Sequence, residues 1–406
     1  MIKLTVMKSG RKNSRLIVAA VQADSGVGRG VLRGIALGAE HLGLAMEHIN
    51  KDFVGGSLAP FAELLRAADG AIVRTRDTYA SARQFLRPEV PVVGIDILPF
   101  WNSGLWATLN PQNEKIGALA ADELLASDCR CYAFVPALPK MPWGDARGKG
   151  FLDRIRAAGG DARRYEPKDT WYSIAERESL ADWLSKLPRP FGIFARNDLI
   201  ARNALGVCKK AGIEVPREAK IIGADNDESL CLYSSPQLSS VRIDHEGAGR
   251  RAVDVVQSFF GKPRPPRPSS LRFGFYGVAR RASTGIAESS GDLRLEVGFD
   301  YIAGHFWNQY LGAGDVAAAM GISRRQAERL FNAAGTSIHQ KLDETRLAHV
   351  KSLLSETDEP LRAIAEECGY SSGIYLSGLF KQRFGITPGQ FRAQRTANRG
   401  EEASRG

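Results

Sequence analysis

The chain lacks the marks of membrane and secreted proteins. No run of about 18 apolar residues occurs, so no transmembrane helix is expected. The N-terminal segment has only a short apolar patch before its basic residues, which is too short for the core of a signal peptide. These absences predict a cytoplasmic location, and they argue against the alternative of a soluble binding protein that feeds a transporter.

Cysteine is scarce, and catalytic constellations are missing. The cysteines show no zinc spacing and leave one unpaired, so we expect reduced, mostly buried thiols; they are Cys129, Cys131, Cys208, Cys231 and Cys368. No Ser-His-Asp set, metal cluster or pair of carboxylates at matched spacing is found. The six histidines are scattered and are interpreted as structural; they include His245, His305 and His339. We therefore expect neither an enzyme nor a cofactor or metal.

One glycine-rich segment keeps an enzymatic alternative open. Gly26, Gly28 and Gly30 follow a strand-like run and resemble a dinucleotide-binding loop. The third spacing is off, however, and the Gly-Lys-Ser/Thr ending of a phosphate-binding loop is absent. Close packing of this segment against a ligand or a neighbouring element explains the glycines adequately.

The chain has a net charge of +10, which by itself suggests binding to nucleic acid. The excess positive charge does not lie in the part of the chain that is predicted to bind DNA. Residues 292–406 contain 14 Lys and Arg and 14 Asp and Glu, so the positive excess lies before them. Any interaction of this C-terminal part with DNA must depend on the local placement of Arg and Lys.

The 406 residues are enough for two or three domains. Between residue 15 and about residue 280, short apolar strands alternate with helical segments, which is typical of parallel sheets with right-handed crossovers. This order predicts an α/β fold of two doubly wound subdomains. The strands are expected in residues 15–21, 43–49, 70–74, 91–97, 131–137, 191–195, 219–225 and 272–281.

The C-terminal part repeats one pattern of two helices and a turn. Residues 315–331 are predicted to form a short helix, a turn at Gly321 and a second helix. Ser323 is the expected N-cap of the second helix. Residues 361–391 repeat the pattern with the turn at Gly369, because a tight helix-helix corner needs a residue at positive φ. This duplication predicts two helix-turn-helix motifs in an all-α domain.

The last hundred residues resemble the AraC/XylS family of transcription regulators. The resemblance rests on both motifs and on the ending Phe384-Gly385-Ile386-Thr387-Pro388 with Phe391 and Arg392. It implies a domain of seven helices and sequence-specific binding to duplex DNA.

The preceding 270 residues resemble the effector domain of LacI-type repressors, which is similar to periplasmic binding proteins. The phrases that carry the resemblance lie at residues 109–125, 147–151, 194–201, 215–227, 236–244 and 280–284. A LacI-type sensor followed by an AraC-type reader resembles the XylR-type regulators. We expect the sensor at residues 1–285 and the DNA-binding domain at 286–400, joined by the small, polar linker 282–292. The proline-rich residues 261–272 are placed inside the sensor.

Ligands of two-lobed open-sheet proteins lie beyond the carboxyl ends of the strands. Polar residues that follow strands are therefore candidates for binding sugar hydroxyls. The resemblance implies that Arg147, Asn197 and Asp225 contact the sugar and that Trp171 stacks on it, while Asp24 and Asp198 are candidates from their positions. Asp198 and Asp225 could instead cap helices or turns.

The first recognition helix has basic and amide side chains that can read base edges. Its candidates are Ser323, Arg324, Arg325, Gln326 and Arg329. The second helix departs from the family by carrying Gly373, Ile374 and Gly378, so it is expected to supply phosphate and apolar contacts. Its candidates are Ser372, Ile374, Tyr375, Ser377, Lys381 and Arg383. Further phosphate contacts are expected from Lys341, Arg346, Lys351 and Arg392.

Together these features predict a DNA-binding transcription regulator, most simply a homodimeric, xylose-responsive activator of catabolic genes that works with RNA polymerase. The alternative is the same regulator with a non-sugar effector or none. Operator sequence, target genes and sign of regulation are not readable from the residues.

Overall fold

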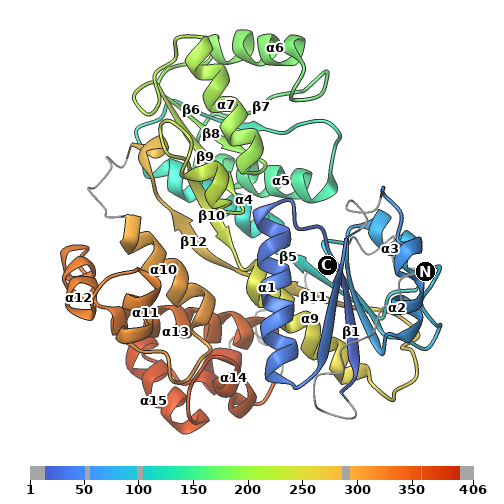
Figure 1. Ribbon diagram of the computed structural model, residues 1–406. Coiled ribbons are helices and arrows are strands. Elements are labelled where there is room, and N and C mark those ends of the chain that lie inside the picture. Colours follow the sequence, from blue (N-terminus) through green and yellow to red (C-terminus); the bar gives the residue numbers. More distant parts are fainter. Residues whose placement is uncertain (1–13, 51–54, 98–103, 286–292, 358, 394–406) are drawn as a thin grey trace. The chain divides into compact units, whose positions relative to one another are not determined.

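The computed structural model describes residues 14–50, 55–97, 104–285, 293–357 and 359–393 (Figure 1). The chain divides into two compact units, Met1–Ala287 and Glu288–Gly406. Across the described residues, no helix combines the length and apolar character needed to cross a membrane.

The first unit contains two six-stranded sheets, each with its own helices. The first lobe is built on a parallel sheet whose strands, in spatial order, are β11 (Ser269–Phe273), β5 (Ala107–Pro111), β4 (Val92–Ile95), β3 (Gly70–Arg74), β1 (Leu16–Ala20) and β2 (Ala45–Ile49). The second lobe is built on β12 (Phe275–Ala279), β10 (Ser239–Ile243), β9 (Ala219–Ala224), β8 (Phe191–Ala195), β6 (Cys131–Val135) and β7 (Ala162–Arg164). In this second sheet, β12 is antiparallel to β10.

The helices follow from these strand connections. The first lobe has α1 (Gly26–His41), η2 (Ala59–Phe61), α2 (Ala62–Ala67), α3 (Arg76–Ala82) and α9 (His245–Phe259). The second lobe has α4 (Asn113–Leu125), α5 (Pro142–Ala157), α6 (Ile174–Ser185), α7 (Asp198–Lys210), α8 (Glu228–Cys231) and η4 (Ala282–Thr284). The chain passes between the sheets after β5, after β10 and between β11 and β12, so the lobes are joined by several crossings.

Strand alternation places helices on both faces of the second sheet. In β6, Cys131, Ala133 and Val135 belong to the apolar cluster that includes α6 and α7. Tyr132 and Phe134 point the other way, into the cluster formed with α4 and α5. The fold class predicted from alternating strands and helices is confirmed. The elements β5, β7, β10, β11, α3 and α8 were not predicted from the sequence.

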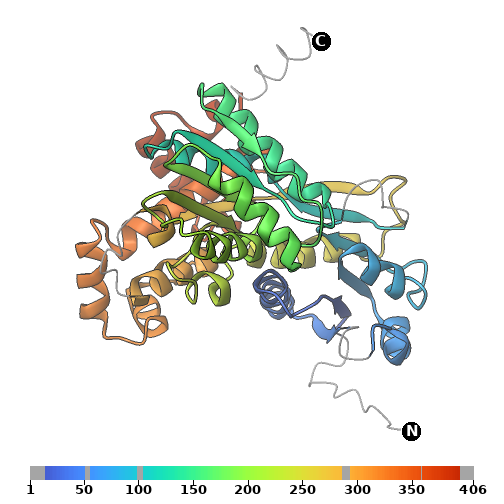
Figure 2. The ribbon, with the colours of Figure 1, turned by 90° about the horizontal axis from the view of Figure 1, so that it is seen from above.

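Glycines allow the closest helix packing in the first unit. Gly26, Gly28 and Gly30 form the first turns of α1, dark blue and seen nearly end-on in Figure 2, so they are not a loop around a dinucleotide. A Cβ at Gly34 would meet the carbonyl oxygen of Glu246 in α9, and a Cβ at Gly249 would meet that of Val31. Close packing of α1 on α9 therefore explains the glycines at positions 30, 34 and 38 of this helix.

We expect Gly34→Ala to destabilise the first unit by roughly 1–3 kcal/mol, because α1 and α9 would have to separate to accept one methyl group. Urea unfolding of the full chain measures this. Gly206→Ala is the matched control, since Gly206 lies inside α7 and a Cβ there meets nothing within 4 Å. The control should gain up to about 1 kcal/mol from helix propensity. Equal behaviour of the two variants would contradict the packing argument.

The second unit is helical throughout its named elements. They are α10 (Leu293–His305), α11 (Ala313–Ala319), α12 (Arg324–Ala333), α13 (Ile338–Glu356), α14 (Leu361–Glu367) and α15 (Gly373–Phe384). The pairs α11–α12 and α14–α15 turn at Gly321 (φ 65°) and Gly369 (φ 75°), as the sequence predicts. Matching residues of the two motifs are buried, namely Val316, Ala317, Ile364 and Ala365, and Phe331 and Phe380 anchor the second helix of each.

Candidate functional site

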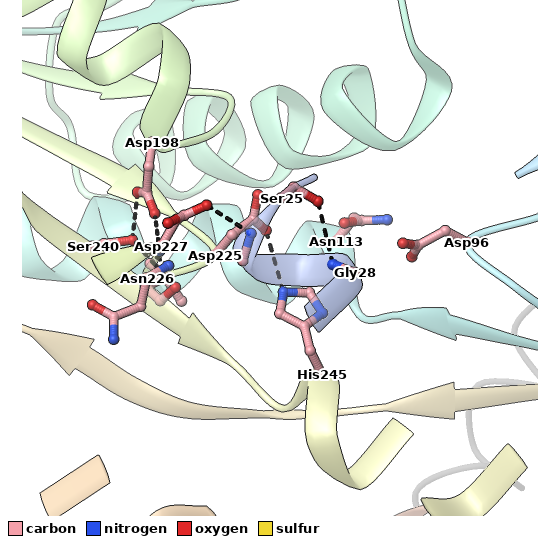
Figure 3. Close-up of polar contacts among 12 residues, drawn as sticks. Ser25, Gly28, Asp96, Asn113, Asp198, Asp225, Asn226, Asp227, Ser240 and His245 are labelled. Atoms are coloured by element: carbon pink, nitrogen blue, oxygen red, sulfur yellow. Dashed lines mark hydrogen bonds and ion pairs between the residues drawn. The ribbon is translucent and has the colours of Figure 1, made fainter. Parts of the chain in front are cut away.

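A turn after β9 gathers the polar residues of the first unit at the carboxyl end of its strand (Figure 3). Asp225 and Asn226 both have positive φ, 103° and 51°. The three backbone N–H groups of residues 225–227 donate to the Val241 carbonyl (3.0 Å), the Ser240 hydroxyl (3.0 Å) and the Asp198 carboxylate (2.8 Å). With these backbone bonds made, the side chains of residues 225–227 point in different directions.

Arg147 of α5 is the main partner of this turn. It is only 4% exposed, and its guanidinium donates to Asn113 Oδ1 (3.1 Å), to the Arg196 carbonyl (2.8 Å) and to Asp225 Oδ1 (3.0 Å). Burial alone would raise the pKa of Asp225, but the charge of Arg147, assisted by His245, holds this pKa below its ordinary value. Asp225 is therefore an anion paired with a buried cation, as suits recognition of hydroxyl groups.

Asp198 differs from Asp225 in the direction of its pKa shift. It is 1% exposed and accepts hydrogen bonds from the Ser240 hydroxyl (2.6 Å) and from Asp227 N–H. Burial raises the pKa of Asp198 to about 8, and the nearby Asp225 carboxylate acts in the same direction. Asp198 thus stabilises the turn by accepting a hydrogen bond from the Asp227 backbone. These bonds are those of a residue that caps a turn, and a ligand role for Asp198 remains a prediction.

The buried Asp198 carboxyl makes stability depend on pH. Its pKa moves from 3.8 to about 8, so within this window the folded chain keeps a proton that the unfolded chain has lost. The free energy of unfolding therefore falls as the pH rises, by at most about 1.4 kcal/mol per pH unit. We expect Asp198→Asn, which does not titrate, to flatten this decline in urea unfolding between about pH 4 and pH 8. The same decline in both proteins would show that Asp198 is not its cause.

The first lobe reaches the same turn from the other side. Gly26 N–H at the start of α1 donates to Asp227 Oδ2 (2.7 Å), and Arg29 lies 3.6 Å from Asp227 Oδ1. His245, the first residue of α9, has its Nε2 atom 3.6 Å from Asp225 Oδ1. Its side chain is buried, and within the described part of the chain neither ring nitrogen has a hydrogen-bond partner. Residues of both lobes thus meet at residues 225–227.

Asp96 and His245 were not predicted as site residues from the sequence. Asp96 follows β4, adopts φ 57° and accepts from Arg74 Nε at 3.0 Å. The sequence predicts a single strand over residues 91–97, which includes Asp96. In the structure β4 ends at Ile95, so Asp96 follows the strand. His245 was predicted to be structural, although its position at the start of α9, two residues after the end of β10, is the signal that could have found it.

The other predicted ligand residues are not all brought together. Asn197 is the N-cap of α7 and accepts from Ile200 N–H at 3.2 Å, while Asp24 is exposed in the segment between β1 and α1. Trp171 lies instead in a groove of about 580 Å³ between α6 and α7, which also contains Ile174 and Leu199. None of the residues lining that groove belongs to the turn after β9. The ligand roles of these three residues remain predictions.

In the second unit, α12 exposes a basic face. Ser323 caps α12 as predicted, and its capping box uses the Gln326 side chain, whose Oε1 accepts from Ser323 N–H at 3.1 Å. Arg324 is paired with Glu328 at 2.8 Å. Arg325 and Arg329 are exposed, lie one turn apart and have no ion-pair partner among the described residues. These two arginines are the side chains most available to reach a base edge.

The second motif presents apolar and hydroxyl groups. Ser372 caps α15 by accepting from Tyr375 N–H at 3.2 Å. Ile374 is 88% exposed and Tyr375 57% exposed, so both apolar side chains face outward at the start of α15. Ser377 is half-buried. At the end of the helix, Lys381 and Arg383 are exposed, and Arg383 lies 3.9 Å from Glu344.

Two predicted phosphate contacts are corrected by the structure. Arg346 is only 8% exposed and donates to the carbonyls of Phe306 (2.7 Å) and Asn308 (2.8 Å), so it ties α13 to the end of α10. Arg392 is half-buried and donates to the Glu359 carbonyl at 2.7 Å. Both guanidinium groups stabilise the fold. The ammonium groups of Lys341 and Lys351 lie 5.3 Å and 5.4 Å from aromatic ring centres and remain candidates.

Comparison with known proteins matches both units. Residues 121–284 match the family model of a periplasmic binding protein-like domain, and residues 316–394 match that of a helix-turn-helix domain. The xylose operon regulatory proteins of Haemophilus influenzae and Escherichia coli K12 are each 31% identical, over 220 and 225 residues, which is 54% and 55% of this chain. The matched region covers 56% of each relative, so the chain spans about half the length of the curated relatives it matches.

A solved structure extends the similarity to both units. The structure of the xylose-binding transcription activator XylR is similar with a TM-score of 0.57 and 24% identity, and the match covers 94% of this chain and 98% of that one. The predicted resemblance to XylR-type regulators is confirmed, and the relatives are transcription regulators. The chain thus carries a periplasmic binding protein-like domain followed by a helix-turn-helix domain, in the fold of that solved regulator.

Proposed function

We propose that this protein is a sequence-specific DNA-binding transcription regulator controlled by a small sugar, most simply an activator of catabolic genes that responds to D-xylose. The supporting relatives carry xylose in their names. The observation on which the proposal chiefly depends is the meeting of charged and unpartnered polar groups of both lobes around Asp225. A bound sugar touching both lobes would favour one arrangement of them over another, which is what a sensor requires.

The chemistry of this cluster suits hydroxyl groups. Arg147 has five N–H donors, of which three are used by Asn113, Arg196 and Asp225, so two remain for a ligand. Asp225 and Asp96 offer carboxylate acceptors, and His245 offers a ring nitrogen without a partner in the described chain. A sugar hydroxyl both donates and accepts, so alternating donors and acceptors at strand ends can bind it specifically.

Titration calorimetry of the full chain with D-xylose, L-arabinose, D-ribose and D-glucose tests the sensor. Selection of bound sequences from a random pool of DNA duplexes, repeated with and without D-xylose, tests the reader. We expect heat with one pentose and a duplex whose recognised bases span roughly two helical turns, because two recognition helices reach successive major grooves. Sequence selection without heat from any sugar would favour the alternative of a non-sugar effector. Failure to enrich any sequence would overturn the proposal.

Partners and location follow from this function. We infer that the protein is a homodimer in the cytoplasm. As an activator it would contact RNA polymerase at promoter DNA. No catalytic step is assigned to the glycine-rich start of α1, where a Cβ at Gly26 would meet the Asp227 side chain and a Cβ at Gly28 the Gln22 carbonyl. Sedimentation velocity with and without the selected duplex tests the dimer, and a monomer in both conditions would overturn it.

A further inference from the structure

The side chains of the turn at residues 225–227 leave it in three directions. Asp225 pairs with Arg147 of the second lobe, and Asp227 accepts from the start of α1 in the first lobe. Asn226 turns elsewhere: its Oδ1 accepts from Arg281 at 2.9 Å. This third contact lies within the second lobe and involves none of the candidate ligand groups, so it needs its own explanation.

Arg281 belongs to the last described segment before the second unit. Its guanidinium also donates to the Leu238 carbonyl at 2.8 Å, and the residue is only 6% exposed. The residues that follow are fixed to the second sheet, since Thr284 and Ser239 share a hydrogen bond of 2.8 Å and Ser283 donates to the Ile221 carbonyl. Gly285 then ends the described part of the first unit.

We propose that Arg281 is a positioning residue that couples the cleft to the second unit through Asn226. This inference rests on the proposed function, because it requires that a ligand binds beside Asp225. A ligand that changes the contacts of Asp225, or of Asp227 with α1, shifts a turn whose backbone is already at positive φ. Asn226 moves with its neighbours, and its bond to Arg281 passes the shift to the segment that leads into the DNA-binding unit.

Position 226 allows a clean test, because the buried Arg281 cannot be removed without risk to folding. Asn226 has φ 51°, which glycine adopts freely, so Asn226→Gly deletes the amide without straining the backbone. Asn226→Asp keeps an acceptor for Arg281 and tolerates the same φ. Thr284→Val is the matched control, since it removes a buried hydrogen bond of the same segment that does not involve Asn226.

The full-length variants are compared in two titrations: D-xylose by calorimetry, and the selected DNA duplex by fluorescence anisotropy with and without saturating D-xylose. We expect Asn226→Gly to keep its sugar affinity within about 3-fold of wild type, while the ratio of DNA affinities with and without sugar falls to about 1. Asn226→Asp and Thr284→Val should keep the wild-type ratio. A wild-type ratio in Asn226→Gly, or a loss equally large in Thr284→Val, would overturn the coupling role and leave the proposed function intact.

If the proposed function were wrong, the wild-type protein would not respond to any sugar. Hydrogen exchange tests the role of Asn226 independently of such a response. In ligand-free protein we expect Asn226→Gly to speed exchange of the Ser283 and Thr284 amides, with β1 unchanged. Both amides are bonded in the structure, to the Gln237 and Arg281 carbonyls. Unchanged exchange at these amides would show that Asn226 does not hold the segment, whatever the effector.

Discussion

Replacing Arg147 by methionine is expected to abolish detectable sugar binding and to destabilise the first unit by about 3–5 kcal/mol. The change leaves the buried Asp225 carboxylate without its cation, and the Arg196 carbonyl and Asn113 amide oxygen lose their donor as well. Affinity should fall at least roughly 100-fold, since a hydrogen bond to a charged group contributes about 1.5–3 kcal/mol and Arg147 has two free donors. Urea unfolding and titration calorimetry measure the two effects.

Arg154→Met is the control on the same helix. Arg154 is 42% exposed and pairs with Asp122 at 2.7 Å on the surface, so its loss should cost less than about 1 kcal/mol and leave sugar affinity unchanged. Arg147→Lys distinguishes charge from geometry, because one ammonium cannot reach three acceptors arranged around a planar fork. If Arg147→Met bound sugar as tightly as Arg154→Met, the cluster around Asp225 would not be the effector site.

Strand-end reasoning predicted two carboxylates of this cluster from the sequence. Asp225 and Asp198 follow apolar strands, and their positions were predicted because parallel strands end at a common edge. Asp96 was missed for a physical reason: apolar residues flank it on both sides, and only its backbone at φ 57° shows that the strand has already ended at Ile95. His245 was missed because helix periodicity does not show which polar residue begins a helix.

Which charged residues are buried was harder to predict from the sequence than which residues follow strands. Arg346 and Arg392 look like surface cations in the sequence, yet each donates to a carbonyl more than thirty residues away in the chain. Gly30, Gly34 and Gly38 of α1 similarly depend on α9, which lies some two hundred residues later. Long-range packing decides both cases, and local patterns cannot report it. The duplicated motif was predictable in detail because its caps, turns and buried positions are all local.

On DNA, Arg325→Ala is expected to lower affinity for the selected duplex by roughly 1–3 kcal/mol, about 5-fold to 150-fold, with little change for random duplex. Arg325 is exposed one turn from Arg329, whereas Arg324 is held by Glu328 and Gln326 by the cap. Gly378→Ala in α15 should change affinity less than about 2-fold, because a Cβ there meets nothing within 4 Å. Fluorescence anisotropy with specific and random duplexes measures both.

Arg362→Ala controls for charge, since Arg362 is an exposed arginine of the same unit that pairs with Glu366 on α14. Its loss should leave the ratio of specific to random affinity unchanged, while Arg325→Ala should reduce that ratio, because only a base contact discriminates between sequences. Equal losses for Arg325→Ala and Gly378→Ala would refute the division of labour between α12 and α15. A uniform loss on both duplexes would instead make Arg325 a phosphate contact, and base reading would then fall to Arg329 or to the exposed Ile374 and Tyr375.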